Sequence, residues 1–373
     1  MTHSDHDTVD TFFHAETITE SHRPGDVLRA RAVIAPQLQA GVASQIVYVS
    51  RTPLGESIPV SGMVIIPDTT AMTGPGPVLV YCTSFHGLGG NDSAPSQLLA
   101  AGVEPEADRI GDALARGWTV AVSDGQGLGM AGVGAHTWLS GYSAAYTALD
   151  IARAASNLPG VDNPDAPIAL WGYADGGRAA IWAGQMADEY APQLDVRGVA
   201  AGAVVADPAA VIAGLDGGPW SGLGLAGLIG LGRAYPHLPT GHVLTSAGQA
   251  AAAQAARMDA AEILASFPQP LAHWCERPDP WADAIWRYVL THEGAGRRAP
   301  QAPVHLYHGS ADTLVPVEQG RALFSSYQLL GVEVSMREYD THHLRTALDG
   351  ADEAVARLAG YLQQPARPRP SQT

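Results

Sequence analysis

Three segments of this 373-residue sequence carry residues whose types and order could support nucleophilic catalysis. Asp312 directly follows the apolar run 303–308, and the pair His342 and His343 precedes the last predicted helix. A carboxylate that orients an imidazole can make it a general base towards a hydroxyl group. The third segment, 170–177, has the Gly-x-nucleophile-x-Gly spacing of a strand-to-helix elbow, but alanine, Ala174, occupies the nucleophile position. The sequence therefore predicts the frame for acyl-transfer chemistry without the oxygen that would be acylated.

Each of these residues has an ordinary structural explanation when it is taken alone. Asp312 could cap a turn, and either histidine could lie in a surface loop. Their order along the chain is nucleophile position, acid and base, and each follows a predicted strand. This joint arrangement favours one shared site, with the base still open between His342 and His343.

The same chemistry requires hydrogen-bond donors for a developing oxyanion. The backbone N–H of Asp175 is one predicted donor, and the glycine-rich loop 83–96 is expected to provide the other, although such a loop can be only a connector. Asp175 could also be considered as a replacement nucleophile. We do not favour this role, because a residue after the elbow's nucleophile position lacks the geometry for attack.

The pattern of apolar runs predicts the elements that must position these groups. Runs 44–51 and 58–66 alternate with a period of two around a turn, which predicts an antiparallel hairpin. Apolar runs then alternate with helical segments, which predicts a parallel sheet covered on both faces. The predicted strands are 78–81, 118–122, 168–171, 196–205, 303–308 and 332–336, and the predicted helices include 104–115, 141–156, one from 317, and 349–361. With the elbow, this pattern predicts an α/β-hydrolase fold, a mostly parallel sheet with an inserted α-helical cap.

The composition along the chain predicts the domain boundaries. We expect the hydrolase core to comprise 25–206 and 300–364, with flexible tails at 1–24 and 365–373. Residues 207–299 show no strand pattern, contain a helical stretch at 247–265, and are expected to form the cap. The apolar, small-residue-rich stretch 217–231 could line an apolar pocket or could be ordinary helix packing.

The overall composition excludes several classes of protein. Hydrophobic residues at 46% and charged residues at 16% indicate a globular chain, and a net charge of −16 argues against a nucleic-acid partner. The sequence has no run of the roughly 18–20 apolar residues that a membrane span needs, and no phosphate-binding or zinc motif, so we expect no cofactor or metal. The N-terminus lacks a signal-peptide pattern, and the only cysteines are Cys82 and Cys275, so we expect a cytoplasmic location. The oligomeric state stays open.

These motifs together resemble the secretory lipase family, which includes fungal lipase A and actinobacterial relatives. The motifs that carry the resemblance are Asp92-Ser-Ala-Pro-Ser96, Ser123-Asp-Gly-Gln-Gly127, the elbow 172–177, the Gly-Gly-Pro-Trp-Ser-Gly segment 217–222, the acid motif that begins at His308, and His343-Leu344. The resemblance implies a helical cap, ester hydrolysis or acyl transfer on an apolar ester or thioester, and His343 as the base. It also implies Asp92 as an oxyanion-hole side chain, which can donate only when protonated.

The chain departs from the family pattern at Ala174, at Ser93 where the family has cysteine, and in the missing export signal. We expect the substrate to contact an aromatic and apolar set, namely Phe85, Tyr173, Trp220 and Leu223.

The alanine at position 174 admits three hypotheses. We favour an engineered Ser→Ala change in an esterase, lipase or acyltransferase, because Asp312, the histidine pair, Asp92 and the elbow glycines all match a working triad. In the second hypothesis the protein naturally lacks a nucleophile and binds a ligand or a partner. In the third, His343 and an oxyanion pocket catalyse an elimination or a cyclisation, which would also explain a retained His–Asp pair.

Overall fold

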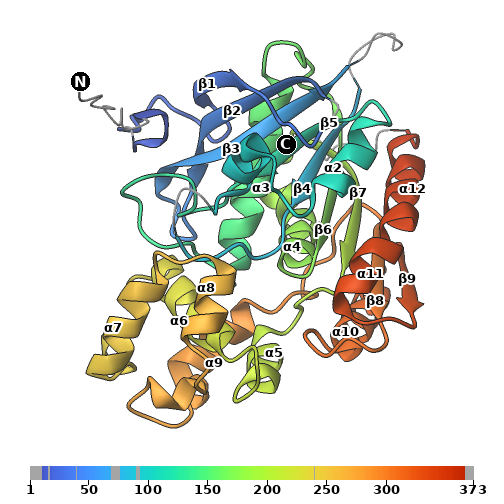
Figure 1. The fold of residues 1–373 in the computed structure, drawn as a ribbon. Coiled ribbons are helices and arrows are strands. Elements are labelled where there is room, and N and C mark those ends of the chain that lie inside the picture. The colour runs from blue at the N-terminus through green and yellow to red at the C-terminus, as the bar shows by residue number, and fades with distance from the viewer. Residues whose placement is uncertain are drawn as a thin grey trace, which may run out of the picture.

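A mixed sheet runs through the centre of the protein (Figure 1). The computed structural model describes residues 11–15, 17–38, 40–68, 76–89, 93–238 and 240–365. Its strands are β1 Val27–Val33, β2 Ala40–Arg51, β3 Ser57–Pro67, β4 Val78–Cys82, β5 Thr119–Ser123, β6 Pro167–Tyr173, β7 Asp195–Gly202, β8 Val304–Gly309 and β9 Val334–Tyr339.

The strand order is β1-β2-β3-β5-β4-β6-β7-β8-β9. Strands β1, β2, β3 and β5 pair in antiparallel fashion, and β5, β4 and β6 to β9 pair in parallel. The predicted hairpin and the mostly parallel sheet are confirmed. Strand β1 was not predicted.

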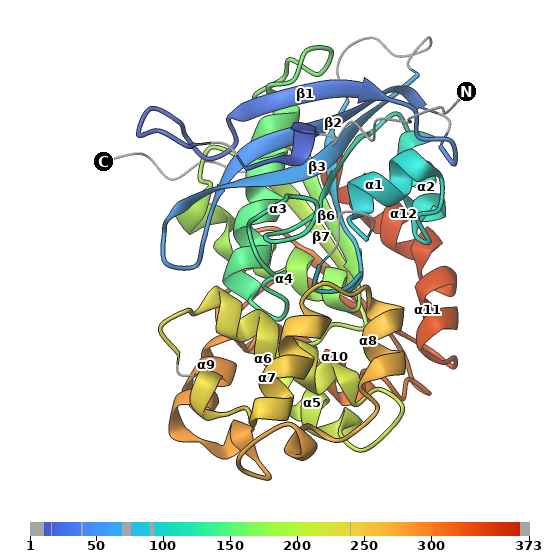
Figure 2. The same cartoon turned by 60° about the vertical axis from the view of Figure 1, so that its left-hand side comes forward.

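Helices cover both faces of the sheet because its central strands are apolar on both sides. In β6, Ile168 and Leu170 enter one hydrophobic core, whereas Ala169 and Trp171 enter the other. The first core is covered by α3 Gly141–Ser156, α4 Asp175–Tyr190 and α10 Val317–Leu329, and the second by α1 Pro95–Ala101, α2 Ala107–Leu114 and α12 Ala351–Leu362 (Figure 2).

The described residues between β7 and β8 form helices and turns but no strand, and we call residues 203–303 the helical segment. Its elements are α5 Pro208–Leu215, α6 Gly222–Ala234, η2 Thr240–His242, α7 Ser246–Ala255, α8 Ala260–Ser266, η3 Leu271–His273, η4 Pro280–Ala282 and α9 Ala284–His292. They gather at one end of the sheet in both views (Figures 1 and 2). The cap boundaries 207–299 stay a prediction.

One predicted helix is divided in the structure, and one helix was not predicted. The stretch 247–265 breaks between α7 and α8, because Asp259 starts a new helix through a reciprocal capping box with Glu262. The last helix is preceded by a separate one, α11 His343–Asp349, so His343 begins a helix instead of lying in a loop.

Part of the predicted N-terminal tail packs on the core. The short helix η1 Thr11–Phe13 buries Phe13 against Val47 and Met130. Residues 1–10 and 366–373 lie outside the described part of the chain. Cys82 and Cys275 are both buried free thiols. Among the described residues, no helix combines the length and apolar character needed to cross a membrane.

Candidate active site

The turn after β6 holds Ala174 in a conformation that residues with a Cβ atom rarely adopt, with φ 53° and ψ −114°. The Ala174 N–H donates to the Gly202 carbonyl oxygen at 2.9 Å, which ties the turn to β7. A Cβ atom at Gly176 would overlap the Cys82 carbonyl oxygen, and one at Gly172 would overlap the Gly176 carbonyl. The turn therefore has the tight backbone of a nucleophile elbow, including its strain, with a methyl group at the nucleophile position.

An acid–base pair lies at the ends of the neighbouring strands. His343 Nδ1 is 2.6 Å from Asp312 Oδ2, and the buried carboxylate also accepts N–H groups from residues 314–315 at 2.9 and 2.8 Å. The Tyr173 hydroxyl donates to the His343 carbonyl oxygen at 2.7 Å. Because Nδ1–H donates to the carboxylate, Nε2 is the nitrogen left to accept a proton. His342 is exposed and makes no such contact, so the geometry favours His343 as the base.

A cavity of about 870 Å³ joins these groups to the helical segment. Ala174, Asp175 and His343 all line it. So do the four residues predicted to contact substrate: Phe85, Tyr173, Trp220 and Leu223. Most of its other lining residues are apolar, and α5, α8 and α11 each contribute some of them, which suits a long apolar ligand. We call this space the substrate cavity.

One of the two predicted oxyanion donors can be placed. The Asp175 N–H is the first of α4 and has no acceptor within its own helix, so it is available to a ligand beside Ala174. Burial raises the pKa of the Asp175 carboxyl to about 6, against the opposing effect of the Arg178 charge. Asp92 lies outside the described residues, so its predicted role stays a prediction.

The loop after β4 is supported by buried charges that the sequence did not reveal. His86 Nδ1 is 2.6 Å from the Ser84 carbonyl oxygen, and His86 Nε2 is 3.1 Å from Glu104 Oε2. The Ser84 hydroxyl donates to Glu106 Oε1 at 2.6 Å. Burial opposes the positive charge of His86, but the hydrogen bond and charge of Glu104 outweigh it and raise its pKa to about 9. Glu104 and Glu106 fall in the first turn of the predicted helix 104–115 and gave no sign of this role, because acidic residues are common at helix N-termini.

This ion pair makes the stability of the protein depend on pH. Since the folded-state pKa of His86 is raised, its contribution is complete below about pH 6.5 and is lost as pH rises through about 9. Between pH 6 and pH 10 we expect urea unfolding to show a loss on the order of 3 kcal/mol from this group. In the His86→Gln protein the free energy of unfolding should not show this decrease between pH 6 and pH 10. In the His242→Gln protein, which is changed at an exposed histidine, the decrease should remain. Equal pH dependence in all three proteins would contradict the assignment.

The sheet, the elbow after β6, the acid after β8 and the base after β9 define an α/β-hydrolase. The solved closed-state structure of lipase A from Candida antarctica has the same fold, with a TM-score of 0.83 and 23% identity over 95% of this chain and 86% of its own. The chain belongs to the secretory lipase family, whose sequence profile matches residues 93–364. The resemblance inferred from the motifs is thereby confirmed.

Two relatives illustrate the range of this family. The chain is 26% identical to Lipase A of Arthroderma benhamiae, over 95% of this chain and 79% of the relative. It is 28% identical to a Mycobacterium tuberculosis protein named a probable inactive lipase, over 84% of this chain and 72% of the relative. Family membership supports a carboxylic ester hydrolase scaffold and an apolar ester as its substrate.

The expected cytoplasmic location is wrong. The matching family is described as secretory, and relatives from Malassezia globosa and Malassezia furfur are named secreted triacylglycerol lipases. These findings point to an extracellular location. The cysteine count and the polar N-terminal residues, on which the expectation rested, do not decide the compartment.

Proposed function

We propose that this protein binds an apolar ester in a lipase-type site without forming an acyl-enzyme. The observation that carries the proposal is the strained elbow at Ala174, in a cavity that also contains His343 and the Asp175 N–H. A bound ester could place its carbonyl oxygen at the Asp175 N–H and its acyl chain along the apolar walls. Without a serine hydroxyl, no covalent intermediate forms at position 174.

We further propose that Ala174 is the natural residue. The relative named a probable inactive lipase supports a loss of activity within this family, whereas no comparison supports the engineered change that the sequence favoured. The codon for position 174 in genomic DNA tests this directly. An alanine codon is expected, and a serine codon would restore the hypothesis of an engineered change.

The helical segment would act as the predicted cap over this site. Its side chains contribute apolar lining from α5 and α6, including Ile212, Leu215 and Leu223. Trp220 also lines the cavity and is 36% exposed, so it would lie where the cavity meets solvent. An apolar wall of this extent favours an acyl chain over a polar ligand.

Ligand titration tests the binding proposal. Titration with methyl decanoate should give a saturable change in tryptophan fluorescence, because Trp138 and Trp220 line the substrate cavity. Leu223→Arg places a charge in the apolar wall and should weaken binding by on the order of tenfold or more. Leu329→Arg, at a residue 90% exposed on α10, is the matched control and should bind normally. The absence of saturable binding to the unaltered protein would overturn the proposal.

A second candidate function rests on the retained His343–Asp312 pair. A protein that only binds esters has no use for a base held 2.6 Å from a buried carboxylate. That geometry favours proton abstraction by His343, as in an elimination or a cyclisation that needs no nucleophile. In this case the unaltered protein turns over its substrate, and His343→Ala abolishes turnover. Binding that persists in His343→Ala without any turnover in the unaltered protein would exclude it.

A further inference from the structure

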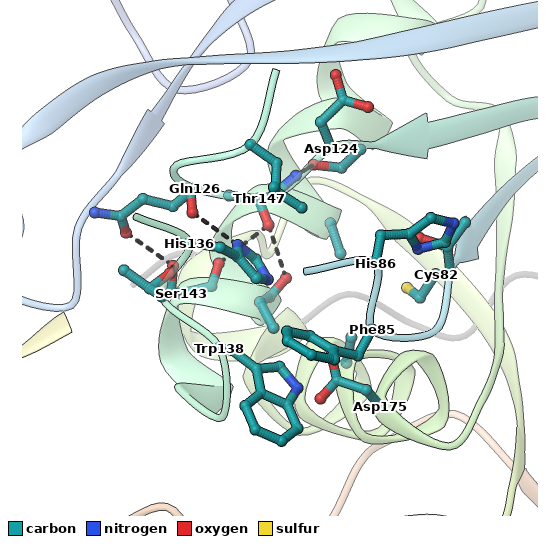
Figure 3. Close-up of a pocket in the computed structure, with 18 of the residues that line it drawn as sticks. Cys82, Phe85, His86, Asp124, Gln126, His136, Trp138, Ser143, Thr147 and Asp175 are labelled. Atoms are coloured by element: carbon teal, nitrogen blue, oxygen red, sulfur yellow. Dashed lines mark hydrogen bonds between the residues drawn. The ribbon is translucent and has the colours of Figure 1, made fainter. Parts of the chain in front are cut away.

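A second cavity, of about 70 Å³, lies behind the elbow (Figure 3). A single layer of side chains separates it from the substrate cavity, since the same residues line both. The shared residues are Ser84, Phe85, His86, Trp138, Leu139 and Asp175. We call this smaller space the rear cavity.

Several buried polar atoms of the rear cavity lack a protein partner. His136 Nδ1 is 2.8 Å from the Gln126 carbonyl oxygen and must donate to it, while burial lowers the pKa of His136 to about 4. The ring is therefore neutral, and Nε2 is an acceptor with no bond to any described residue. Arg178 Nε is buried without a hydrogen-bond partner among the described residues.

The Asp175 carboxyl group also lacks a well-aligned hydrogen-bond partner among the described residues, although the Trp138 indole lies close enough to lower its pKa. The Asp124 carboxylate, in contrast, is satisfied by the Ser61 hydroxyl at 2.6 Å and by the N–H and hydroxyl of Ser96 at 2.7 and 2.6 Å. The unpartnered groups of the rear cavity therefore come from two places, the loop that carries His136 and the first turn of α4, which carries Asp175 and Arg178.

The rest of the wall is polar and ordered. The Ser143 hydroxyl donates to Gln126 Oε1 at 2.8 Å, and the Thr137 and Ser143 hydroxyl oxygens are 2.7 Å apart. The Thr147 hydroxyl donates to the Ser143 carbonyl oxygen at 3.1 Å. Figure 3 shows Gln126, Ser143 and Thr147 around the His136 ring.

We propose that the rear cavity is a binding site for a small cluster of ordered water molecules, which feeds water to the substrate cavity. A buried polar atom without a partner costs about 1–3 kcal/mol, and a water needs roughly 10–15 Å³ of such space together with two to four polar partners. The rear cavity meets both conditions for several waters. It is too small for an ester, and it holds charges of both signs, which disfavours a single bound ion.

The layer between the two cavities offers a route for that water. The Phe85 and Trp138 rings stack with centroids 4.3 Å apart, and Asp175 is next to Ala174 in the same layer. Rotation of one aromatic side chain would connect the cavities close to the ester carbonyl. This role rests on the proposed function, because it requires an ester bound beside Ala174.

The chemistry that such water would serve can be written for the Ala174→Ser protein. In deacylation the water oxygen bonds to the acyl carbon while one water proton moves to His343 Nε2. The bond between the acyl carbon and the serine oxygen then breaks, and His343 returns the proton to that oxygen. The products are the free acid and the regenerated serine.

A crystal structure of the unaltered protein near 1.2 Å resolution tests the water site independently of any activity. We expect at least two ordered waters in the rear cavity, one of them within hydrogen-bond distance of His136 Nε2 and one of the Asp175 carboxyl. A rear cavity without ordered water bonded to these atoms would overturn the proposal.

Partition of the acyl group tests the route. In the Ala174→Ser background with methanol present, the acyl-enzyme gives either free acid or methyl ester. Ala148→Leu places a larger side chain in the rear cavity wall and should raise the ratio of methyl ester to acid severalfold. Ala253→Leu, the same change at an exposed position of α7, should not alter the ratio.

The two experiments separate the possible failures. An unchanged ratio in a folded Ala148→Leu protein would overturn the route even if the waters are present. A folded Ala174→Ser protein that forms no acyl-enzyme would overturn the route, whereas the methyl decanoate titration decides the proposed binding function and the crystal structure decides whether the water site exists.

Discussion

Replacing Ala174 by serine should turn this protein into an esterase. The substitution adds one oxygen to an elbow that already has the required conformation, beside His343 and the Asp175 N–H in one cavity. Loss of a catalytic serine lowers kcat by up to about 10⁶, and the rate enhancement that remains from the oxyanion donors alone is much smaller. We therefore expect Ala174→Ser to raise the rate of ester hydrolysis by at least about 10³. Hydrolysis of p-nitrophenyl butyrate measures this gain in rate, and covalent labelling by a fluorophosphonate shows that the new serine is nucleophilic.

Two variants control this experiment. Ala174→Gly removes the strain of the positive φ without supplying a nucleophile and should stay inactive. The Ala174→Ser, His343→Ala double variant retains the hydroxyl but lacks the base and should lose nearly all of the gained activity. A folded Ala174→Ser protein that neither hydrolyses the ester nor takes the label would show that the site is not a serine hydrolase site in latent form.

The positions of the elbow, the acid and the base could be predicted because each depends on short-range patterns. Gly172 and Gly176 are required by backbone contacts within the turn and with β4, and Asp312 and His343 each follow a strand end in a parallel sheet. Parallel strands bring such ends together at one edge of the sheet. This rule allowed the sequence to predict the fold class and the proximity of the elbow, Asp312 and His343.

The interactions that hold the loop after β4, which join His86 to Glu104 and Ser84 to Glu106, could not be predicted, because the paired residues are distant in sequence. Glu104 pairs with His86 only once the loop after β4 is packed against the segment that precedes α2. The rear cavity could not be predicted for the same reason, since His136 and Asp175, which both line it, lie on segments that are distant in sequence. The break between α7 and α8 escaped prediction for a different reason. An alanine-rich stretch carries a strong helical preference that masks the local capping residue Asp259.

Asp312 should be the most sensitive position in the serine-restored protein. Its carboxylate accepts two backbone N–H groups through Oδ1 and the His343 Nδ1–H through Oδ2. In the Asp312→Asn protein, the amide oxygen can take the place of Oδ1 and accept the same two backbone N–H groups. The amide NH₂ then takes the place of Oδ2 and faces His343 Nδ1. The imidazole would then carry its proton on Nε2 and could not accept a proton from serine.

We expect Asp312→Asn to lower kcat for an activated ester by on the order of 10⁴ in the Ala174→Ser background, with little change in KM because the substrate cavity is intact. Asp340→Asn is the matched control, since Asp340 lies on the neighbouring loop and, within the described part of the chain, accepts a hydrogen bond only from the Ser310 hydroxyl, at 3.2 Å. Its activity should stay close to that of the parent. A loss of less than about tenfold in a folded Asp312→Asn protein would mean that His343 does not act as the base, because an imidazole in the wrong tautomer cannot support that rate.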